Sequence, residues 1–453
     1  MGRKKRTEII EKGSLVKGLL ILSAPLMLSN LLKALHDFID TFFLGGVEGS
    51  AAAQAAIAVS SPLAMTLLAV PAGLAIGIIA TVSHSLGEND KQGAKRLMGI
   101  SFTVGLILSV ALTVLSYFAC PLILGAFSEG EPLRLAREYI RLRSFELPAA
   151  VLFEIYRGQR QAQGDTVNPL LYSLITVGLN ITLTATAVYL GFGIRGAAAA
   201  TVVSQWTVIP IILIAFFRSK KYLTINLKEM ALEKKRTLRL LKISLPTAVS
   251  GALAAIGFLF LQYFVRNFGN ETVAAFSVCN RITNILTVPI SALAGVLVTF
   301  IGQNEGTGNR QRSIKAYKVS RNAAVILMAA FAVCIYFVRA PIIAAVSNNE
   351  EVRAAAAEYL VWALAALPLL GLFQNYCGAY NGYGKTGYTF ILESARLWGL
   401  RLPLVFLLTV IIPLGRSGIW YGMMISNILI CVLGFILLKI CRGKRQKYKK
   451  KPA

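Results

Sequence analysis

The sequence is poor in the residues on which most soluble enzymes depend. Its 453 residues include 2 histidines and only 15% charged residues, whereas 56% are hydrophobic. Catalysis by a histidine base beside a nucleophile, or by a carboxylate cluster, is therefore not expected. The chain also has no GxxxxGK(S/T) motif, so ATP is not indicated as an energy source. This composition predicts a polytopic membrane protein that is not an enzyme.

Cysteine is scarce as well, and its spacing excludes the common metal motifs. The cysteines stand singly in or near apolar runs, without a CxxC pair. We expect them to be packing residues with no metal or disulfide role. They are Cys120, Cys279, Cys334, Cys377, Cys431 and Cys441.

The sequence contains long apolar runs with few charged residues. A helix of roughly 20 residues crosses a hydrocarbon core of about 30 Å, and twelve runs reach that length. They show no period of two, so helices are predicted rather than the strands of a barrel. No small-residue cleavage site follows the first run, which we expect to be retained. The expected spans are residues 19–44, 52–80, 98–124, 139–160, 169–190, 194–217, 243–266, 276–301, 317–340, 357–380, 388–412 and 417–440.

The excess of positive charge gathers on one side of the predicted spans. The formal net charge is +26, and most Lys and Arg residues fall on the side shared by both termini. By the positive-inside rule, we expect a multi-pass protein of the plasma (inner) membrane with both termini in the cytoplasm. The basic clusters then indicate contact with membrane lipids and no nucleic-acid partner.

The second half of the chain repeats the first. YIRLRSFELPAAVLFEIYRGQRQAQGDT (139–166) aligns without a gap to YLVWALAALPLLGLFQNYCGAYNGYGKT (359–386), which pairs Gly158 with Gly378. Each half contains six expected spans, an even number, so both halves enter the membrane from the same side. The sequence predicts an all-α integral membrane fold of two six-helix lobes related by a pseudo-twofold axis along the membrane normal.

The repeat also sets the expected domain boundaries. Within the segment between the halves, residues 227–242 are compatible with an amphipathic helix on the inner leaflet and equally with a solvated connector. The expected parts are an N-terminal lobe (1–218), a basic cytoplasmic linker (219–242), a C-terminal lobe (243–441) and a basic cytoplasmic tail (442–453).

Four ionisable residues stand together in the first predicted span. A charge at the middle of a membrane helix costs about 2.5 to 3.5 kcal/mol, so a stripe of such residues must face protein or water. Loss of hydration favours a protonated carboxyl there, as a proton carrier requires. In the alternative interpretation, Lys33 pairs with Asp37 and Asp40 lies at the outer interface. The four residues are Lys33, His36, Asp37 and Asp40.

Other polar residues in the predicted spans are divided unevenly between the halves. Apart from Glu358 at the very start of span ten, spans seven, eight and ten contain no carboxylate, so coupling through a carboxylate is expected in the first half. Glu393 and Arg396, three residues apart in span eleven, are expected to form an internal ion pair. The first half contains Glu146, Glu154, Asn180, Thr184, Thr201 and Gln205, and the second contains Gln262, Arg281, Asn284, Gln374 and Asn375.

Three segments resemble the multidrug and toxic compound extrusion (MATE) exporters of prokaryotes, and the DinF-like branch is the closer resemblance. They are SAPLMLSNLLKALHDFIDTFFLG (23–45), GDTVNPLLYSLITVGLNITLTATAVYLGFGIRGAAAATVVSQ (164–205) and VPISALAGVLVTFIGQNEGTGNRQRSIKAYK (288–318). The likeness covers nearly the whole chain. It implies an antiporter that exchanges Na⁺ or H⁺ for organic, often cationic, compounds through a cavity between two lobes. It also implies that Asp40, in the DTFF segment, is the central coupling carboxylate.

One position departs from the pattern of that family. Asn180 and Thr201 stand where the resemblance implies an Asn and a Thr of the coupling network, but NITLT places Thr184 where an Asp is expected. A Na⁺ site needs several oxygen ligands, whereas a proton site needs a single carboxylate. We therefore expect H⁺ coupling, with Na⁺ as an alternative.

These observations predict a monomeric secondary antiporter that exports small organic, cationic compounds and has no bound metal or cofactor besides its coupling ion, H⁺ or Na⁺. A flippase for lipids or lipid-linked oligosaccharides, and a non-transporting receptor or scaffold, are the alternatives. The predicted coupling residues are Asp40, Asp37, His36, Asn180, Thr184 and Thr201, and Pro25 is the predicted hinge of the first helix. The predicted substrate cavity contains Lys33, Phe153, Glu154, Gln205 and Asn284.

Overall fold

The structure is built from helices, as the uninterrupted apolar runs predict. A computed structural model describes residues 8–45, 50–126, 129–219, 221–346 and 349–449, and for residues 36–45, 50–51, 345–346 and 442–449 it describes the backbone alone. No strand occurs within these ranges. The predicted all-α membrane fold is confirmed.

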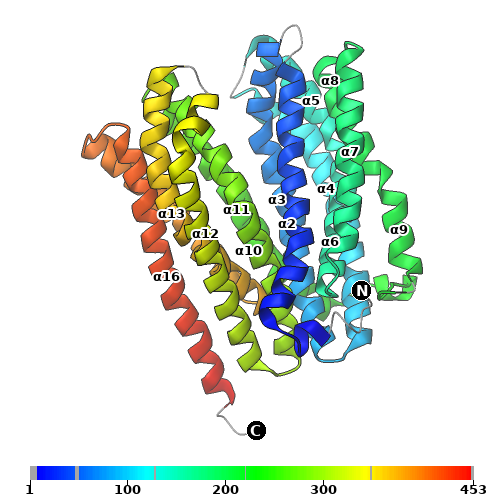
Figure 1. Cartoon of the computed structure of the whole chain (residues 1–453). Coiled ribbons are helices and arrows are strands. Elements are labelled where there is room, and N and C mark those ends of the chain that lie inside the picture. The colour runs from blue at the N-terminus through cyan, green and yellow to red at the C-terminus, as the bar shows by residue number, and fades with distance from the viewer. Residues whose placement is uncertain (1–7, 46–49, 127–128, 220, 347–348, 450–453) are drawn as a thin grey trace.

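The first lobe is formed by eight labelled helices, which occupy the right-hand side of Figure 1. Hydrogen-bonded caps define some of their ends; for example, Asp90 accepts a hydrogen bond from Gly93 N at the start of α4. The helices are α2 (Leu15–Gly45), α3 (Ser50–Gly87), α4 (Lys91–Leu124), α5 (Gly130–Ser144), α6 (Leu147–Ala162), α7 (Val167–Tyr189), α8 (Gly193–Thr207) and α9 (Ile209–Arg218).

The second lobe contains five long helices, two short ones and, near its end, two π-helical segments. A single 3₁₀ turn, η1, precedes it, and the π-helical segments are η2 and η3. The elements are η1 (Leu227–Met230), α10 (Lys234–Arg266), α11 (Asn270–Gly306), α12 (Arg310–Val346), α13 (Glu350–Gly382), α14 (Thr386–Ser394), η2 (Ala395–Arg401), α15 (Leu402–Phe406), η3 (Leu407–Ile411) and α16 (Ser417–Lys449).

Eleven helical stretches of the described chain are long and apolar enough to cross a membrane, against twelve predicted spans. The difference lies in the span expected at 139–160, which is divided into α5 and α6 at Phe145 and Glu146. The corresponding helix of the second lobe, α13, is continuous although it contains Pro368. The two lobes therefore differ where their sequences align without a gap.

The predicted repeat appears as equivalent contacts in the two lobes. A Cβ atom added to Gly158 of α6 would lie 3.0 Å from the main-chain oxygen of Ala75 in α3, and one added to Gly378 of α13 would lie 2.7 Å from that of Ala294 in α11. In each lobe, a residue without a side chain allows two helices to pack backbone against backbone.

The segment between the lobes is more compact than either predicted form. It contains the 3₁₀ turn η1, in which Asn226 N donates to Glu229 Oε2, and Thr103 Oγ1 of α4 donates a hydrogen bond of 2.7 Å to Met230 O. From Lys234 onward the chain already belongs to α10. No separate amphipathic helix therefore forms within residues 227–242.

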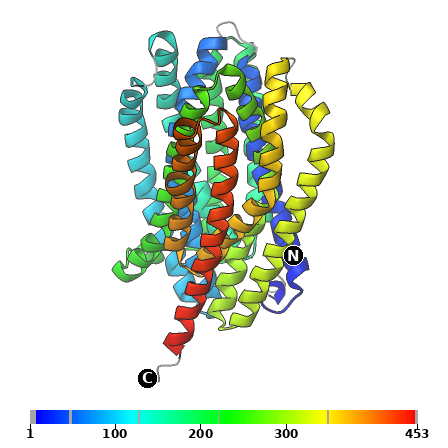
Figure 2. The same cartoon turned by 90° about the vertical axis from the view of Figure 1, so that its left-hand side faces the viewer.

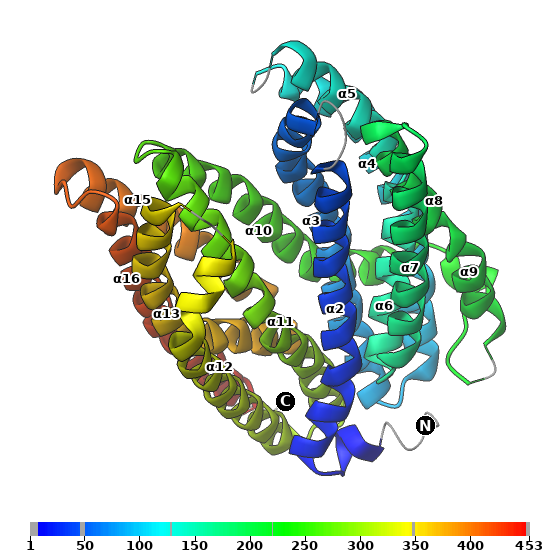
Figure 3. The ribbon, with the colours of Figure 1, turned by 45° about the horizontal axis from the view of Figure 1, so that its top comes forward.

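The two lobes lie side by side with their helices running in a common direction (Figures 1 and 2). Each has its own buried apolar core. The lobes approach one another at the end that contains both termini and diverge toward the other end, as Figure 3 shows. All six cysteines are free, and five are buried while Cys334 is exposed.

Candidate functional site

The predicted coupling residues of the first span lie in the last turns of α2. The backbone is helical there, but the side chains of His36, Asp37 and Asp40 lie outside the described residues. Their roles therefore stay predictions. The position of α2 is fixed about three turns before Asp40, where Ser29 Oγ lies 2.9 Å from Ser173 Oγ of α7.

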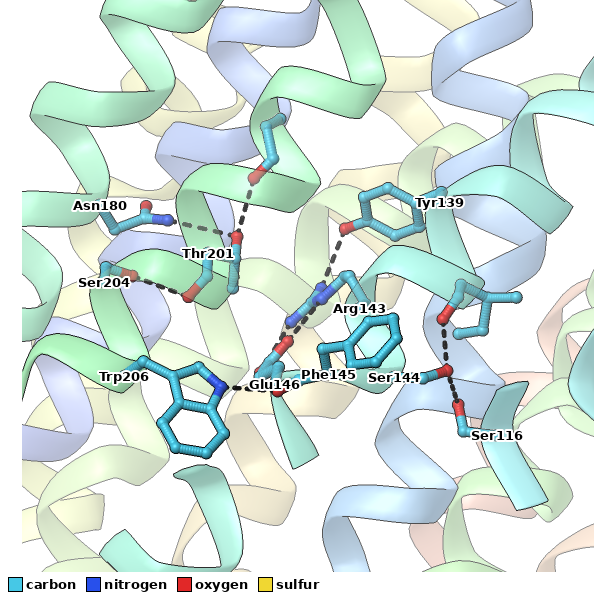
Figure 4. A network of polar contacts seen from close by, with 12 residues as sticks. Ser116, Tyr139, Arg143, Ser144, Phe145, Glu146, Asn180, Thr201, Ser204 and Trp206 are labelled. Atoms are coloured by element: carbon cyan, nitrogen blue, oxygen red, sulfur yellow. Dashed lines mark hydrogen bonds and ion pairs between the residues drawn. The ribbon is translucent and has the colours of Figure 1, made fainter. Parts of the chain in front are cut away.

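A buried polar group joins α7 to α8. Asn180 Nδ2 donates a hydrogen bond of 3.2 Å to Thr201 Oγ1, which donates in turn to the main-chain oxygen of Ala197 (Figure 4). Asn180, Thr184 and Thr201 are all buried. The side-chain oxygen of Asn180 has no hydrogen-bond partner among the described residues. The structure thus brings Asn180 and Thr201 together and leaves one amide oxygen available to a proton donor or a cation.

Lys33 is paired across the lobe. Its Nζ donates a hydrogen bond of 3.0 Å to Glu154 Oε1 of α6 and lies 5.6 Å from the ring centre of Phe153. Arg157 Nε, from the next turn of α6, donates to the other carboxylate oxygen at 2.7 Å. The structure therefore brings together three predicted cavity residues, Lys33, Phe153 and Glu154, and adds Arg157, which the sequence analysis did not select.

The break between α5 and α6 contains a second charged pair. Arg143 donates hydrogen bonds of 2.7 and 3.1 Å to the two oxygens of Glu146, and a third to the hydroxyl of Tyr139. Trp206 of α8 donates its indole N–H to the main-chain oxygen of Phe145, which the break leaves available (Figure 4). Pro148 removes a helical hydrogen bond next to this break, but the aligned Pro368 leaves α13 continuous, so proline alone is no signal for the break.

Pro25 lies between two differently anchored parts of α2. Before it, Leu19 and Leu22 pack into the core of the second lobe, and Arg312 of α12 donates hydrogen bonds to the main-chain oxygens of Ile10 and Gly13. After it, the Ser29 and Lys33 contacts described above attach the helix to the first lobe. Leu26, one residue after Pro25, still packs in the second-lobe core, so the predicted hinge lies about one turn before α2 passes to the first lobe.

The remaining predicted cavity residues do not join this group. Gln205 is half-buried on α8 and has no side-chain hydrogen bond within the described part of the chain. Asn284, on α11, instead lines a cavity of about 250 Å³ inside the second lobe. The wall of that cavity also contains Gln374, Arg396, Arg401, Trp362 and Trp420.

Both arginines of this second-lobe cavity are on the π-helical segment η2. Arg401 donates hydrogen bonds to Ser426 Oγ at 3.2 Å and to Asn427 Oδ1 at 2.8 Å, both on α16. The guanidinium of Arg396 lies 4.4 Å from the ring centre of Phe373. Its Nε is buried and has no hydrogen-bond partner among the described residues.

The ion pair expected between Glu393 and Arg396 is absent. Both residues are described, and no carboxylate oxygen lies within the 4.0 Å limit of an ion pair from the Arg396 guanidinium. The expectation assumed α-helical spacing, whereas α14 gives way to η2 at Ala395, between the two residues. Glu393 still acts on Arg396 through its charge, while the guanidinium lies near the Phe373 ring and in the wall of the cavity.

Side-chain-to-main-chain hydrogen bonds close the end of the molecule that holds the termini. Gln161 Nε2 of α6 donates to Gly295 O of α11 at 2.8 Å, and Gln303 Nε2 of α11 donates to Ala162 O at 2.8 Å. Close backbone packing continues this contact along α3 and α10, where a Cβ on Gly73 would collide with the main chain of Ala248. We call this contact between the lobes the seam.

Two pseudo-symmetric lobes that meet at one end, with buried polar groups at the depth of the membrane, define a multi-pass membrane protein with the plan of alternating-access carriers. The sequence model of the MatE family matches residues 25–186 and again residues 246–407. The chain belongs to the MatE family. The two matches also confirm the internal repeat.

Individual relatives cover nearly the whole chain. The probable multidrug resistance protein YpnP of Bacillus subtilis is 25% identical, and the match covers 96% of this chain and 97% of YpnP. The multidrug export protein MepA of Staphylococcus saprophyticus is 24% identical over 96% of each chain. Among solved structures, a MOP superfamily transporter from Pyrococcus furiosus aligns with a TM-score of 0.90 and 25% identity over 96% of this chain and 97% of its own. For that transporter, a reverse polarity of the binding pocket was taken to suggest a different function.

Proposed function

We propose that this protein is a secondary active exporter that moves small organic compounds out of the cell by alternating access, in exchange for protons. The seam is the observation that supports this proposal most directly. A few hydrogen bonds and backbone contacts close one end, whereas the lobes diverge at the other (Figure 3). With both termini in the cytoplasm, as the charge distribution predicts, the closed end faces the cell interior and the plasma-membrane protein is open outward.

The relatives support a broad range of substrates. YpnP and MepA are named for multidrug resistance and multidrug export. For this chain we propose small organic compounds as substrates, handled by a monomer in contact with membrane lipids. Because Glu154 pairs with Lys33, the carboxylates Asp37 and Asp40 are the groups left on this stripe to favour an organic cation.

The register of two neighbouring helices supports Asp40 as the proton site. Helices α2 and α7 both start at the end that holds the termini, and they touch at Ser29 and Ser173. Asp40 and Thr184 each stand eleven residues beyond that contact, so their backbones lie at the same level. A hydroxyl at this level supplies one neutral oxygen, which suits a protonatable carboxylate better than a Na⁺ ion that needs several hard ligands.

Helix α2 also offers a path from this proton site to the seam. Its first part, as far as Leu26, packs in the second lobe and its last part in the first lobe, with Pro25 close to the change. Protonation of Asp40 would change the attachment of the last part alone, and a bend at Pro25 would pass that change to the lobe contact. Coupling requires the proton and the substrate to favour different states of the same element.

A second candidate function is the flipping of lipids or lipid-linked oligosaccharides. The observation in its favour is the cavity of the second lobe, in which Arg396 and Arg401 would attract a phosphate group. The charged pairs of the first lobe and the broad substrate range of the relatives favour export of small compounds.

The substitution Asp40→Asn tests the proposed function. Because asparagine cannot bind a proton, we expect proton-driven uptake of ethidium into everted vesicles to fall at least about tenfold, while Asp40→Glu keeps measurable transport. The measurement is fluorescence under separately imposed pH and Na⁺ gradients. Undiminished proton-driven transport by Asp40→Asn would show that Asp40 is not the coupling residue. Transport that responds to the Na⁺ gradient alone would show that Na⁺, not H⁺, is the coupling ion.

A further inference from the structure

The cavity of the second lobe has the chemistry of an anion site. It encloses about 250 Å³, and Arg396 and Arg401 are the charged residues in its wall. Within the described chain, no carboxylate oxygen lies in ion-pair distance of either guanidinium. The carboxylate of Glu358, one residue before Tyr359 of the wall, is bound by Arg416 and Ser417. Glu393 lies beyond ion-pair distance but close enough for its charge to act on Arg396. The two arginines of the cavity therefore share one nearby carboxylate, and neither forms an ion pair.

The π-helical segment η2 is what brings the two arginines together. In an α-helix, residues five apart are rotated by about 140° from one another. In η2 the hydrogen bonds join residues five apart, as Leu402 N and Leu397 O show. Arg401 therefore follows Arg396 by one full turn on the same face. A π-helical segment is a frequent feature of functional sites.

The surroundings of the arginines suit a flat organic anion. Arg401 is held in place by Ser426 and Asn427, whereas Arg396 has an unused Nε–H. A guanidinium presents paired N–H groups that match carboxylate, sulfonate or phosphate oxygens. Tyr359 and Trp420, whose ring centres are 4.2 Å apart, give the same cavity an aromatic wall.

We propose that this cavity binds the anionic group of an aromatic organic compound. This inference rests on the proposed function and names its substrate class: compounds that carry an acidic group, alone or together with the cationic group expected near α2. Two positive charges near a single carboxylate in a partly buried site are unfavourable, and an anion bound between Arg396 and Arg401 would offset that cost. Amide groups of Asn280, Asn284 and Gln374 would bind the remaining polar atoms.

Equilibrium binding of dansylglycine, a fluorescent aromatic carboxylate, tests the proposal. Its methyl ester is the matched neutral probe. Of the four tryptophans, Trp362 and Trp420 line the cavity, so energy transfer to the dansyl group reports occupancy. In phosphatidylcholine nanodiscs we expect the acid to bind at least about tenfold more tightly than the ester, and Arg396→Gln to remove that preference. Arg396→Lys should keep part of it, and Arg266→Gln, an exposed arginine of α10, should leave it unchanged.

The outcomes separate this proposal from its alternatives. Equal affinity for acid and ester, or a preference that survives both Arg396→Gln and Arg401→Gln, would overturn it. Displacement of dansylglycine in phosphatidylglycerol nanodiscs would assign the cavity to a lipid headgroup instead. The measurement uses no ion gradient, so failure here would leave proton-coupled export untouched. Conversely, unchanged dansylglycine binding by Asp40→Asn together with lost ethidium transport would support both proposals independently.

Discussion

Glu154 accepts hydrogen bonds from two cations that stand on different helices, Lys33 on α2 and Arg157 on its own α6. Its side chain is only 11% exposed, so the site is largely excluded from solvent. Removal of its charge therefore leaves the guanidinium of Arg157 there without an ion-pair partner. We expect Glu154→Gln to lower the free energy of unfolding by about 1 to 3 kcal/mol. Denaturant titration in detergent, followed by circular dichroism, measures the change.

The carboxylate of Glu138, whose side chain is 28% exposed at the surface, provides the control for that experiment. It receives hydrogen bonds from Arg195 and Arg134 at the surface, and the hydrogen bond from Arg195 lowers the pKa of Glu138 below its ordinary value. It therefore stays ionised in mildly acidic buffer, and exposed pairs contribute little to stability. Because the lowered pKa means that the folded protein stabilises the ionised form, Glu138→Gln should lower the unfolding midpoint slightly, and clearly less than Glu154→Gln. An equal loss in both variants would show that Glu154 has no special role.

The sequence did not predict pairs whose two residues lie far apart in the chain. It also mispredicted a pair whose spacing depends on the type of helix. Lys33 and Glu154 are separated by 121 positions, so no local pattern could join them, whereas Asp37 is one turn from Lys33. The pair of Glu393 and Arg396 was expected from α-helical spacing, which η2 interrupts. Single residues at membrane depth were therefore easy to find, and their partners were not.

Backbone contact between helices is the feature that we would test at the scale of single elements. A Cβ on Gly378 would lie 2.7 Å from the main-chain oxygen of Ala294, closer than atoms of packed helices come, so α11 and α13 must move apart in Gly378→Ala. We expect this variant to lose about 1 to 3 kcal/mol of unfolding free energy. The same denaturant titration in detergent measures it.

Gly178 of α7 is the matched control, because an added Cβ there meets nothing within 4 Å. Alanine is a better helix former than glycine by roughly 0.8 to 1.0 kcal/mol. Gly178→Ala should therefore be neutral or slightly more stable than the parent protein. If Gly378→Ala behaved in the same way, the tight packing of α11 against α13 would be disproved.

Whole elements were easier to predict than their interruptions. Apolar runs of about 20 residues and the alignment of the two halves predicted two lobes and twelve spans, and eleven membrane-length helical stretches are found in the described chain, because a membrane helix must be long and apolar. The division between α5 and α6 was missed, since Pro148 and Pro368 occupy aligned positions but only the first lobe has Arg143 and Glu146 beside the break. The π-helical segments η2 and η3 have no comparable composition signal in this sequence.

Considered as a whole, the molecule must separate its lobes at the seam if it transports by alternating access. A Cβ on Gly251 of α10 would lie 3.0 Å from the Cβ of Ala69 in α3, and disulfides join Cβ atoms about 3.5 to 4.5 Å apart. The double variant Ala69→Cys with Gly251→Cys should therefore form a disulfide after a small adjustment. We expect the oxidised form to lose ethidium transport at least about tenfold and to regain it after reduction.

The two single-cysteine variants control for the substitutions themselves and for the native exposed Cys334. They should transport at parental rates with and without oxidant. Mass spectrometry of the double variant checks that the disulfide has formed. Full transport by the cross-linked protein would contradict opening at the seam and, with it, alternating access between these lobes.

The hydrogen bonds of the seam end on peptide oxygens, those of Gly295 and Ala162 among them. A peptide oxygen remains whatever side chain the residue carries, so a change at the accepting position does not call for a compensating change in the donor. Positions 161 and 303 must therefore keep a side chain that donates a hydrogen bond, whereas the accepting positions need only a side chain that fits the space available. In a comparison of many related chains, paired changes should be rare across this contact, and coevolution would underestimate how closely the two lobes approach.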